Sequence, residues 1–396
     1  MTRLLRLREA EQRRGVALSP AEARQLHETG IAAVSPGAEL GTFDLRVGHS
    51  IGTIGFGGLH ITIAPKLPVS RVMWMLMVGG LDPEWREDDV ALDTSDTVEA
   101  LAHLYLRELD AVLRRGLVCG YHDVEQTDVV LRGRLRIGEQ FGRHYGMLYP
   151  LEIEYQEYDR DIPENQILLS ALLVLVETLQ ASGSQLAPQL SGVVPRFAGV
   201  TPIVAGSTRP TVHVTRLNEY YSNAFALADL VLRGSGLSEA VGEQPGKGIL
   251  FPMWSVFERF VARILAQKLT GARVSSQYST PLVNESTEPF LIRPDIVIME
   301  GGLRRVVVDT KFKSAVPTSG DLYQMCAYAG VLGVQDVMLL YAEPAEPRTL
   351  TVSGTGVRVH IRGVDLSGDR DLAVQSVVYA VTSVRSNLHS AIQISA

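Results

Sequence analysis

The fold of this chain is decided by residues 292–311, IRPDIVIMEGGLRRVVVDTK. Two apolar runs lie on either side of Gly301–Gly302, a dipeptide typical of tight hairpin turns, so the pattern predicts two antiparallel strands. Asp295 comes just before the first run, and Asp309 and Lys311 come at the end of the second. Because side chains alternate along a strand, Asp309 and Lys311 share one face.

The length of the turn decides whether the two carboxylates can meet. A strict two-residue turn at Gly301–Gly302 would pair Asp295 with Val308 and direct Asp309 to the opposite face. An odd-length loop or a β-bulge would instead set Asp295 opposite Asp309. If both carboxylates belong to one site, we therefore expect a bulge or an odd-length loop in this hairpin. The alternative interpretation is that these residues are ordinary charges at strand ends.

Two carboxylates and a lysine on adjacent strands are the residues that a magnesium-dependent nuclease requires. Carboxylate oxygens are hard ligands that hold Mg²⁺, for which Mn²⁺ can substitute, against a scissile phosphate. A nearby ammonium can orient the attacking water, and the free amine can deprotonate it. We therefore predict that Asp295 and Asp309 bind the metal and that Lys311 acts on the water.

A helix is predicted before these strands. Apolar residues recur with helical spacing from Trp254 to Leu269, and Glu258 lies beside this apolar stripe. A carboxylate in that place requires a partner. Glu258 can support the metal site as a third carboxylate, or it can form an ion pair with Arg259, Arg263 or another basic side chain.

A second helix is predicted after the strands, where Thr318 or Ser319 can cap it. Offsets of three and four place Asp321, Gln324 and Tyr328 on one face of this helix. Gln324 and Tyr328 can orient a phosphate or the lysine of the site. They can also form a purely structural hydrogen-bonded pair.

Basic residues gather around this centre although the whole chain is acidic. The formal net charge of −7 argues against a protein that coats nucleic acid by electrostatics alone. A local basic patch is sufficient for a nuclease, and Arg293 and Lys313 are the candidates for DNA contact. Arg132, Arg134 and Arg136 alternate along a further expected strand, where they form a solvated face or meet phosphates or an acidic partner.

The motifs around the centre resemble those of a known nuclease fold. Glu258, Arg293-Pro294-Asp295, Asp309-Thr310-Lys311 and the Gln324 to Tyr328 segment resemble the PD-(D/E)xK nuclease fold, in the variant with a Gln-x-x-x-Tyr motif after the lysine. The further segments 61–67, 131–136 and 158–165 resemble the McrC subunit of modified-cytosine restriction systems. The resemblance runs over nearly the whole chain.

The resemblance implies a partner protein. McrC-like subunits act with a ring-forming McrB-like AAA+ GTPase that recognises modified DNA and translocates, so GTP would enter only through the partner. Residues 242–248, GEQPGKG, lack the spacing of a phosphate-binding loop, and Gly248 stands where a Ser or Thr is needed. By resemblance, the N-terminal module docks into the ring and stimulates its GTPase activity.

The apolar pattern predicts an α/β chain, α+β overall, with three parts. Residues 1–150 are expected to form a β-rich partner-binding domain, 151–245 a helical middle region, and 246–396 a PD-(D/E)xK restriction-endonuclease-like domain. The elements expected within these parts are a Gly-rich β region at 43–67, helices near 97–115, 163–180 and 217–232, and a mostly irregular segment at 181–210.

The composition is that of an ordinary globular protein. The chain has 396 residues, of which 46% are hydrophobic, enough for two or three domains with their own cores. Residues 1–6 lack the apolar core of a secretion signal, and we expect no apolar run long enough to span a membrane. Cys119 and Cys326 indicate neither a disulfide framework nor a zinc site. The expected location is the cytoplasm.

Taken together, the residues and the resemblance favour a Mg²⁺-dependent DNA endonuclease subunit of a modification-dependent restriction complex, acting in antiphage defence. Two alternatives remain open. A stand-alone RecB-type DNA-repair nuclease shares the Gln-x-x-x-Tyr variant and would need no AAA+ partner. A non-catalytic activator of the AAA+ ring could keep the nuclease fold as a scaffold, although it would not need the charges of Asp295, Asp309 and Lys311.

Overall fold

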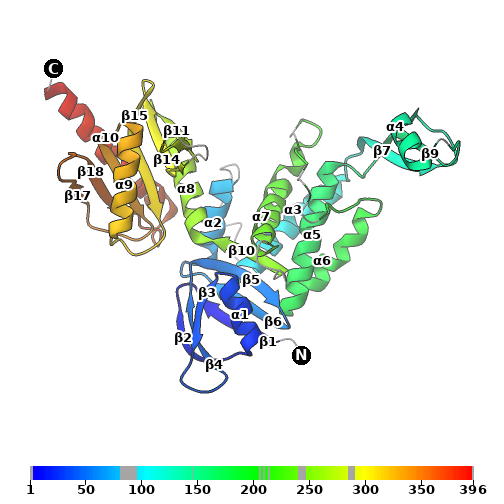
Figure 1. Cartoon of the computed structure of the whole chain (residues 1–396), viewed down its shortest axis with the longest axis horizontal. Helices are drawn as coiled ribbons and strands as arrows, with labels where there is room; N and C mark the ends of the chain where they lie inside the picture. Colours follow the sequence, from blue (N-terminus) through cyan, green and yellow to red (C-terminus); the bar gives the residue numbers. More distant parts are fainter. Residues whose placement is uncertain are drawn as a thin grey trace.

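The computed structural model of the chain describes residues 3–80, 96–145, 147–204, 207, 210–212, 215–239, 247–283 and 290–394. Helices and several separate β-sheets make it a mixed α/β protein, as the sequence predicts. Figure 1 shows an N-terminal unit at the bottom, a C-terminal unit at the upper left, a group of helices at the centre and right, and an arm that projects from these helices. Most of residues 242–248, the segment that lacks the spacing of a phosphate-binding loop, lies outside the described residues.

The N-terminal unit consists of two small sheets and one helix. The first sheet has the order β1 (Arg3–Arg8), β6 (Leu59–Ala64), β5 (Ser50–Phe56) and β10 (Lys247–Pro252). The second has the order β2 (Gln12–Ala17), β4 (Thr42–Val47) and β3 (Ala32–Pro36), and α1 (Pro20–Glu28) packs on β3. Apolar side chains from both sheets and from α1 form one core. Strands β4 to β6 confirm the expected Gly-rich β region.

Strand β10 joins the N-terminal sheet although it lies far away in the sequence. It pairs antiparallel with β5, with Ile249 opposite Thr53. A Cβ at Gly52 would lie 2.1 Å from the carbonyl oxygen of Ile249, and one at Gly248 would lie 2.1 Å from that of Thr53. The close approach of the two backbones therefore requires glycine on both strands. α8 (Met253–Lys268) follows β10 directly.

A layer of helices connects the two units. It contains α2 (Val69–Gly80), α3 (Thr97–Arg115), α5 (Pro163–Ser182), α6 (Ala187–Val193) and α7 (Ser222–Glu239), with the 3₁₀ turns η2 (Val194–Phe197) and η3 (Glu219–Tyr221). α3, α5 and α7 confirm the helices expected there. The 181–210 segment, for which the sequence predicts mostly loop with room for a short turn of helix, contains α6 and η2, whose residues Leu190 and Phe197 are buried in the shared core.

Helix α5 corrects the expectation about apolar runs. Among the described residues it is the one helix long and apolar enough to cross a bilayer by length and composition. Half of the most apolar stretch of this helix is buried. Leu168, Leu172 and Leu175 pack in the core formed by the neighbouring helices. The core helix of a globular protein has the same properties, and α5 is packed as one.

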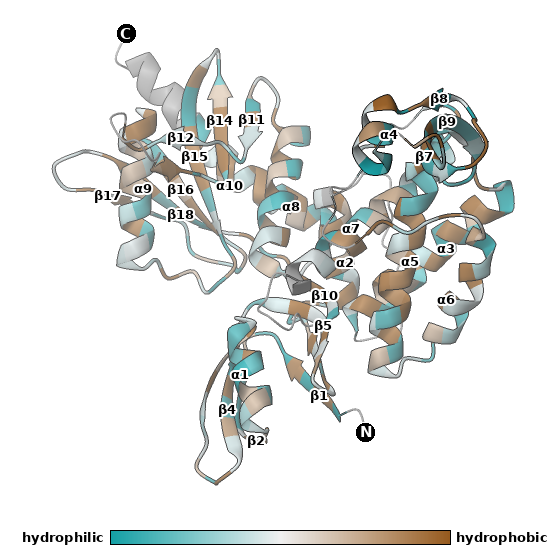
Figure 2. Cartoon of the chain, turned by 45° about the vertical axis from the view of Figure 1, so that its right-hand side comes forward, coloured by the Kyte–Doolittle hydropathy of each residue, from teal (hydrophilic) through white to brown (hydrophobic). Residues whose placement is uncertain are grey.

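A narrow arm projects from the helical layer at the right of Figure 1. It consists of β7 (Gly120–Asp128), β8 (Arg134–Leu135), α4 (Ile137–His144) and β9 (Leu151–Asp159), with β7 and β8 both paired to β9. Figure 2 shows that apolar residues, in brown, occur along this arm. The side chains of Tyr145, Leu148 and Phe141 are exposed by 91%, 80% and 66%, so the arm does not bury its own apolar surface.

The three arginines of the arm do not form the single strand face that the sequence predicts. Only Arg134–Leu135 is a strand there, because Gly133 has a φ of 62° and turns the chain. Arg134 forms an ion pair with Glu154 on β9, and Arg136 forms ion pairs with glutamates of β7 and α4. Arg134 and Arg136 are thus tied within the arm.

The C-terminal unit is a mixed sheet between helices. Its strand order is β11 (Arg273–Ser276), β14 (Ile296–Glu300), β15 (Leu303–Lys311), β16 (Asp336–Tyr341), β18 (Arg358–Gly363) and β17 (Arg348–Thr351). A short pair, β12 (Thr280–Pro281) and β13 (Leu291–Ile292), lies beside it. α9 (Ser319–Leu332) packs on one face, and α8 and α10 (Arg370–Ile394) pack on the other. Because both faces are covered, β16 is buried along its whole length.

The expected division of the chain at residues 150 and 245 stays a prediction. β7 and β9 lie on either side of residue 150 and pair with each other. β10 returns to the N-terminal sheet after residue 246. One large core runs from α2 and α3 through α7 to α8 and the C-terminal sheet.

Candidate active site

The hairpin of β14 and β15 contains the bulge that the sequence predicts. Glu300 pairs with Leu303 around a two-residue glycine turn, and Met299 pairs with Arg304. The register then shifts, so that Ile298 pairs with Val306 and Ile296 with Val308. The shift leaves Arg305 as the extra residue of β15. Continued by one residue, the register sets Asp295 opposite Asp309, as a site shared by both carboxylates requires.

Asp295 and Asp309 are held in different ways. Asp295 Oδ2 accepts hydrogen bonds from the backbone N–H and the hydroxyl of Thr310, both at 2.7 Å. Asp309 is only 2% exposed. Burial raises the pKa of Asp309 to about 6, and the charge of Asp295 adds to the effect while Lys311 opposes it. Burial also raises the pKa of Asp295, against the two hydrogen bonds from Thr310. The two carboxylates therefore carry their negative charges at a cost.

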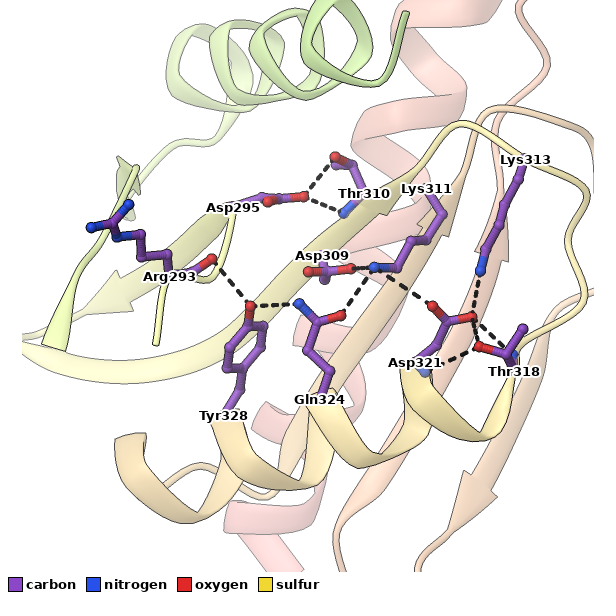
Figure 3. Close-up of polar contacts among 10 residues, drawn as sticks. All are labelled: Arg293, Asp295, Asp309, Thr310, Lys311, Lys313, Thr318, Asp321, Gln324 and Tyr328. Carbon is purple, nitrogen blue, oxygen red and sulfur yellow. Dashed lines mark hydrogen bonds and ion pairs between the residues drawn. The ribbon is translucent and has the colours of Figure 1, made fainter. Parts of the chain in front are cut away.

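Lys311 lies at the centre of the polar cluster (Figure 3). Its Nζ is 2.6 Å from Asp309 Oδ2 and 3.7 Å from Asp321 Oδ1, and it donates a hydrogen bond to Gln324 Oε1 at 3.1 Å. Burial lowers the pKa of Lys311, but the carboxylates around it, Asp309 first, raise it by more. The net pKa is above the ordinary value, so Lys311 is an ammonium at neutral pH.

Helix α9 brings Gln324 and Tyr328 to this lysine. Thr318 caps the helix, as predicted, and its side chain accepts a hydrogen bond from the Asp321 backbone. Gln324 Nε2 donates to the Tyr328 hydroxyl at 2.7 Å, and that hydroxyl donates to the backbone carbonyl oxygen of Arg293 at 3.1 Å. Burial raises the pKa of Tyr328 to about 12. The geometry therefore links the pair to Lys311 and to the segment before Asp295.

Asp321 is a member of the cluster that sequence reasoning did not assign to the site. Its Oδ2 forms an ion pair with Lys313 Nζ at 2.7 Å and accepts a hydrogen bond from the backbone N–H of Thr318 at 2.8 Å. Its position three residues before Gln324 was the only signal in the sequence. Lys313, a candidate for DNA contact, is thus tied to Asp321, with a side chain that is 35% exposed.

Glu258 lies half-buried on α8. Burial raises its pKa to about 7, and the charges of Asp295 and Asp309 add to this, while Arg259 opposes it. In the described part of the chain, no basic side chain lies within ion-pair distance of Glu258. A pocket of about 210 Å³ adjoins it, lined by Glu258, Arg259, Arg263, Gln277 and neighbouring residues of α8 and β11. Glu258 therefore lies close enough to Asp295 and Asp309 for their charges to raise its pKa.

One expectation about this helix is wrong. The helical spacing predicts that Trp254 belongs to the buried stripe, but Trp254 is 58% exposed. Phe257, Val261 and Leu265 are buried, and Met253 takes the place at the start of the stripe. The helix begins at Met253, directly after Pro252; the side chain of Met253 faces the core and that of Trp254 faces solvent.

The donor set fits Mg²⁺ in its chemistry. Carboxylate oxygens are hard ligands, and Asp309 Oδ2 is buried without a hydrogen-bond donor of good geometry among the described residues. No group of three or more His, Cys, Asp or Glu side chains in those residues is arranged to hold an ion alone. Mg²⁺ is commonly held by one or two carboxylates together with waters and substrate phosphates, so two aspartates suffice.

The fold and the cluster define a class, the mixed α/β proteins with buried carboxylates and a lysine at the ends of central strands. The family described as "McrBC 5-methylcytosine restriction system component" matches residues 45–342, about three quarters of the chain. The chain therefore belongs to the McrBC family, and its resemblance to McrC is confirmed. No curated protein matches it.

One solved structure supports the same fold. A chain in the half-complex of Thermococcus gammatolerans McrB AAA+ hexamers with bound McrC is similar, with a TM-score of 0.61 and 19% identity. The match covers 96% of this chain and 100% of that chain. A second match, to the Thermococcus gammatolerans McrBC complex, has a TM-score of 0.43 and 22% identity, over 67% of this chain and 87% of that one. The first match shows that the fold is McrC-like.

Proposed function

We propose that the chain is the Mg²⁺-dependent endonuclease subunit of a modification-dependent restriction complex, with Mn²⁺ able to substitute. It would cleave DNA phosphodiesters in antiphage defence through a PD-(D/E)xK centre. The observation that carries this proposal is the bulged pairing of β14 and β15. The bulge sets Asp295 opposite Asp309, while Lys311 lies 2.6 Å from the buried Oδ2 of Asp309.

The residues of the site would have different roles in hydrolysis. Asp295 and Asp309 would hold the metal, which polarises a phosphate and acidifies a bound water. The two hydrogen bonds from Thr310 fix the orientation of the Asp295 carboxylate. Because its pKa is raised, Lys311 would orient the water and offset negative charge as an ammonium, and it would not remove the proton itself.

The remaining residues would position these groups. Gln324 holds the ammonium of Lys311, and Tyr328 holds Gln324. Glu258 has a pKa of about 7, so it is partly protonated in the metal-free protein at neutral pH. A nearby cation favours the charged carboxylate, so Glu258 would support the metal site from α8. Arg293 would contact the DNA backbone beside this centre, with Lys313 as the second candidate.

A McrB-like AAA+ GTPase ring is the proposed partner, and GTP would be bound by that partner. Membership of the McrBC family and the McrC-like fold support the proposal. The arm offers a surface for such contact, because the exposed side chains of Phe141, Tyr145 and Leu148 would be stabilised by burial in a complex. The complex would act on modified DNA in the cytoplasm and would need no membrane.

Reconstitution of the full chain with a McrB-like AAA+ protein tests the function. DNA containing 5-methylcytosine, and unmodified DNA of the same sequence, is incubated with GTP and with Mg²⁺ or a chelator. We expect cleavage only of the modified DNA, only with GTP and Mg²⁺, and none with Asp309→Ala. Asp365→Ala, which removes an exposed aspartate outside the cluster, is the control.

The two alternatives predict different results in the same assay. Cleavage of unmodified DNA without the partner would favour a stand-alone RecB-type repair nuclease. Stimulated GTP hydrolysis without cleavage, unchanged by Asp309→Ala, would favour a non-catalytic activator. The family match argues for restriction over repair.

A further inference from the structure

Lys311 lies between two carboxylates that belong to different elements. Its ammonium is 2.6 Å from Asp309 Oδ2, on the same strand, and 3.7 Å from Asp321 Oδ1, on α9. Figure 3 shows the lysine side chain reaching between the two aspartates, with Gln324 below it. The lysine therefore has one close acidic partner and a second one within a short side-chain movement.

The close partner carries the oxygen that a metal would need. Asp309 Oδ2 is buried, and among the described residues no donor of good hydrogen-bond geometry reaches it, so its charge is balanced by the ion pair with Lys311. A divalent cation and an ammonium repel each other strongly when both contact one carboxylate oxygen. Binding of a cation at Asp309 therefore requires Lys311 to move away from that oxygen.

Asp321 is arranged to receive the displaced lysine. Its Oδ2 is occupied by the backbone N–H and the hydroxyl of Thr318, at 2.8 and 2.9 Å, and by Lys313 at 2.7 Å. These contacts leave Oδ1 on the side of Lys311. Burial raises the pKa of Asp321, but the hydrogen bonds from Lys313 and Thr318 lower it by more, to about 2. Asp321 therefore keeps its negative charge at any pH near neutrality.

We infer that Asp321 is a positioning residue that accepts Lys311 when a divalent cation takes Asp309, so that the lysine changes partner without leaving the site. This inference rests on the metal site proposed at Asp295 and Asp309. In the metal-free protein Lys311 blocks Asp309. In the metal-bound protein Asp321 and Gln324 hold the ammonium beside the cation.

A double-mutant cycle on Mg²⁺ affinity tests the exchange of partners, by isothermal titration calorimetry on the full chain without DNA or nucleotide. Lys311→Met removes the competitor at Asp309, so Mg²⁺ should bind about tenfold more tightly. Asp321→Asn removes the second partner, so Mg²⁺ should bind about five- to tenfold more weakly. In the Lys311→Met background, Asp321→Asn should have little effect, because no ammonium needs a new partner.

Three further variants separate this exchange from a general effect of charge. Lys313→Met removes the same charge from a lysine that contacts Asp321, and it should tighten Mg²⁺ binding clearly less than Lys311→Met does. Thr318→Ala removes the helix cap and one hydrogen bond to Asp321 Oδ2 without changing the charge, so it measures the effect of loosening α9 and Asp321 while the carboxylate remains. Asp321→Glu keeps the negative charge and should recover most of the affinity that Asp321→Asn loses. Thermal melts show which variants are folded.

The outcomes that overturn the inference are distinct from failure of the metal site. If Asp321→Asn weakened Mg²⁺ binding equally in the wild-type and Lys311→Met backgrounds, Asp321 would act only through its general negative charge. This result would overturn its role as the second partner of Lys311. So would equal tightening by Lys313→Met and Lys311→Met. If wild-type protein shows no Mg²⁺ binding that Asp309→Ala removes, the proposed metal site itself fails, and the exchange of partners fails with it.

Discussion

The hydroxyl of Tyr328 donates a hydrogen bond to the backbone carbonyl oxygen of Arg293, at 3.1 Å. The same hydroxyl accepts a hydrogen bond from Gln324, which in turn holds Lys311. Helix α9 therefore ties the lysine at the end of β15 to the segment that leads into Asp295. Residues of α9 therefore align the end of β15 with the start of β14.

Tyr328→Phe should break this link while leaving the ring in place. We expect a loss of about 1 to 2 kcal/mol in the free energy of unfolding, because the amide of Gln324 and the carbonyl of Arg293 lose a partner in a buried region. Cleavage should fall by about ten- to a hundredfold, because Lys311 and Asp295 are less well aligned. Chemical denaturation and cleavage kinetics measure the two effects.

Tyr341→Phe is the matched control for that change. The Tyr341 hydroxyl is buried on β16 and has no hydrogen-bond partner among the described residues. Its removal should leave the protein equally stable or slightly more stable, because an unsatisfied polar group is removed from the core. Equal losses in the two variants would contradict a specific role for the Tyr328 hydroxyl.

Asp295→Ala, Asp309→Ala and Lys311→Ala should each abolish DNA cleavage while the fold and the assembly with the partner remain. Loss of a carboxylate ligand, or of the ammonium beside it, should cost orders of magnitude in rate. Single-turnover cleavage with modified DNA measures the rate, and size-exclusion chromatography with the partner checks assembly. Mg²⁺-dependent cutting by purified Asp309→Ala would disprove the assignment.

Glu258 should make the metal-free protein less stable as the pH rises. Its pKa is raised from 4.5 to about 7 in the folded state, so the folded state binds the proton more tightly than the unfolded state. The resulting stability is fully present below about pH 4.5 and is lost as the pH rises through about 7. Glu258→Gln should flatten this decline in part, because Asp309, with a pKa of about 6, contributes to it as well.

The same variant separates a metal-supporting role from a structural one. At pH 8, Glu258→Gln should leave the metal-free melting temperature unchanged or slightly higher, and it should reduce the rise that Mg²⁺ produces by binding the folded state. If Glu258 were instead a structural ion-pair partner, the variant would lower the melting temperature equally with and without Mg²⁺ and would cut DNA almost normally.

Charge on the arm should uncouple the chain from its partner. We expect Phe141→Glu and Leu148→Glu to reduce stimulation of the partner's GTP hydrolysis about tenfold or more, because a charge would enter an apolar contact. Both side chains are exposed, so the melting temperature should not change. Leu372→Glu, at an exposed apolar position on α10, is the control and should stimulate normally. Normal stimulation by both arm variants would exclude the arm as the contact.

Much of the site could be predicted because its constraints are local. The turn at Gly301–Gly302 and the need for Asp295 to meet Asp309 together predict a bulge, and the structure contains one. The spacing of Gln324 and Tyr328 on one helix predicts that they share a face, and they are hydrogen-bonded. Periodicity of two or of 3.6 residues carries this information within a short segment.

What could not be predicted depends on contacts between distant segments. The pairing of β10 with β5 joins residues almost two hundred positions apart, and nothing in either strand specifies the other. The exposure of Trp254 depends on which neighbouring elements cover the first turn of α8, and the apolar pattern of the helix does not specify them. The ion pairs of Asp321 depend on the path of the chain between Lys311 and Thr318.

β10 runs directly into α8 at Pro252 and Met253, so one continuous stretch of chain links the N-terminal sheet to the helix that packs on the C-terminal sheet. Its first part is locked to β5 by glycine contacts that allow no side chain, and its second part carries Glu258. No loop separates this strand from this helix, so we expect a shift of the N-terminal sheet to move α8 as well. We therefore expect the position of Glu258 relative to Asp295 and Asp309 to respond to changes in the N-terminal sheet.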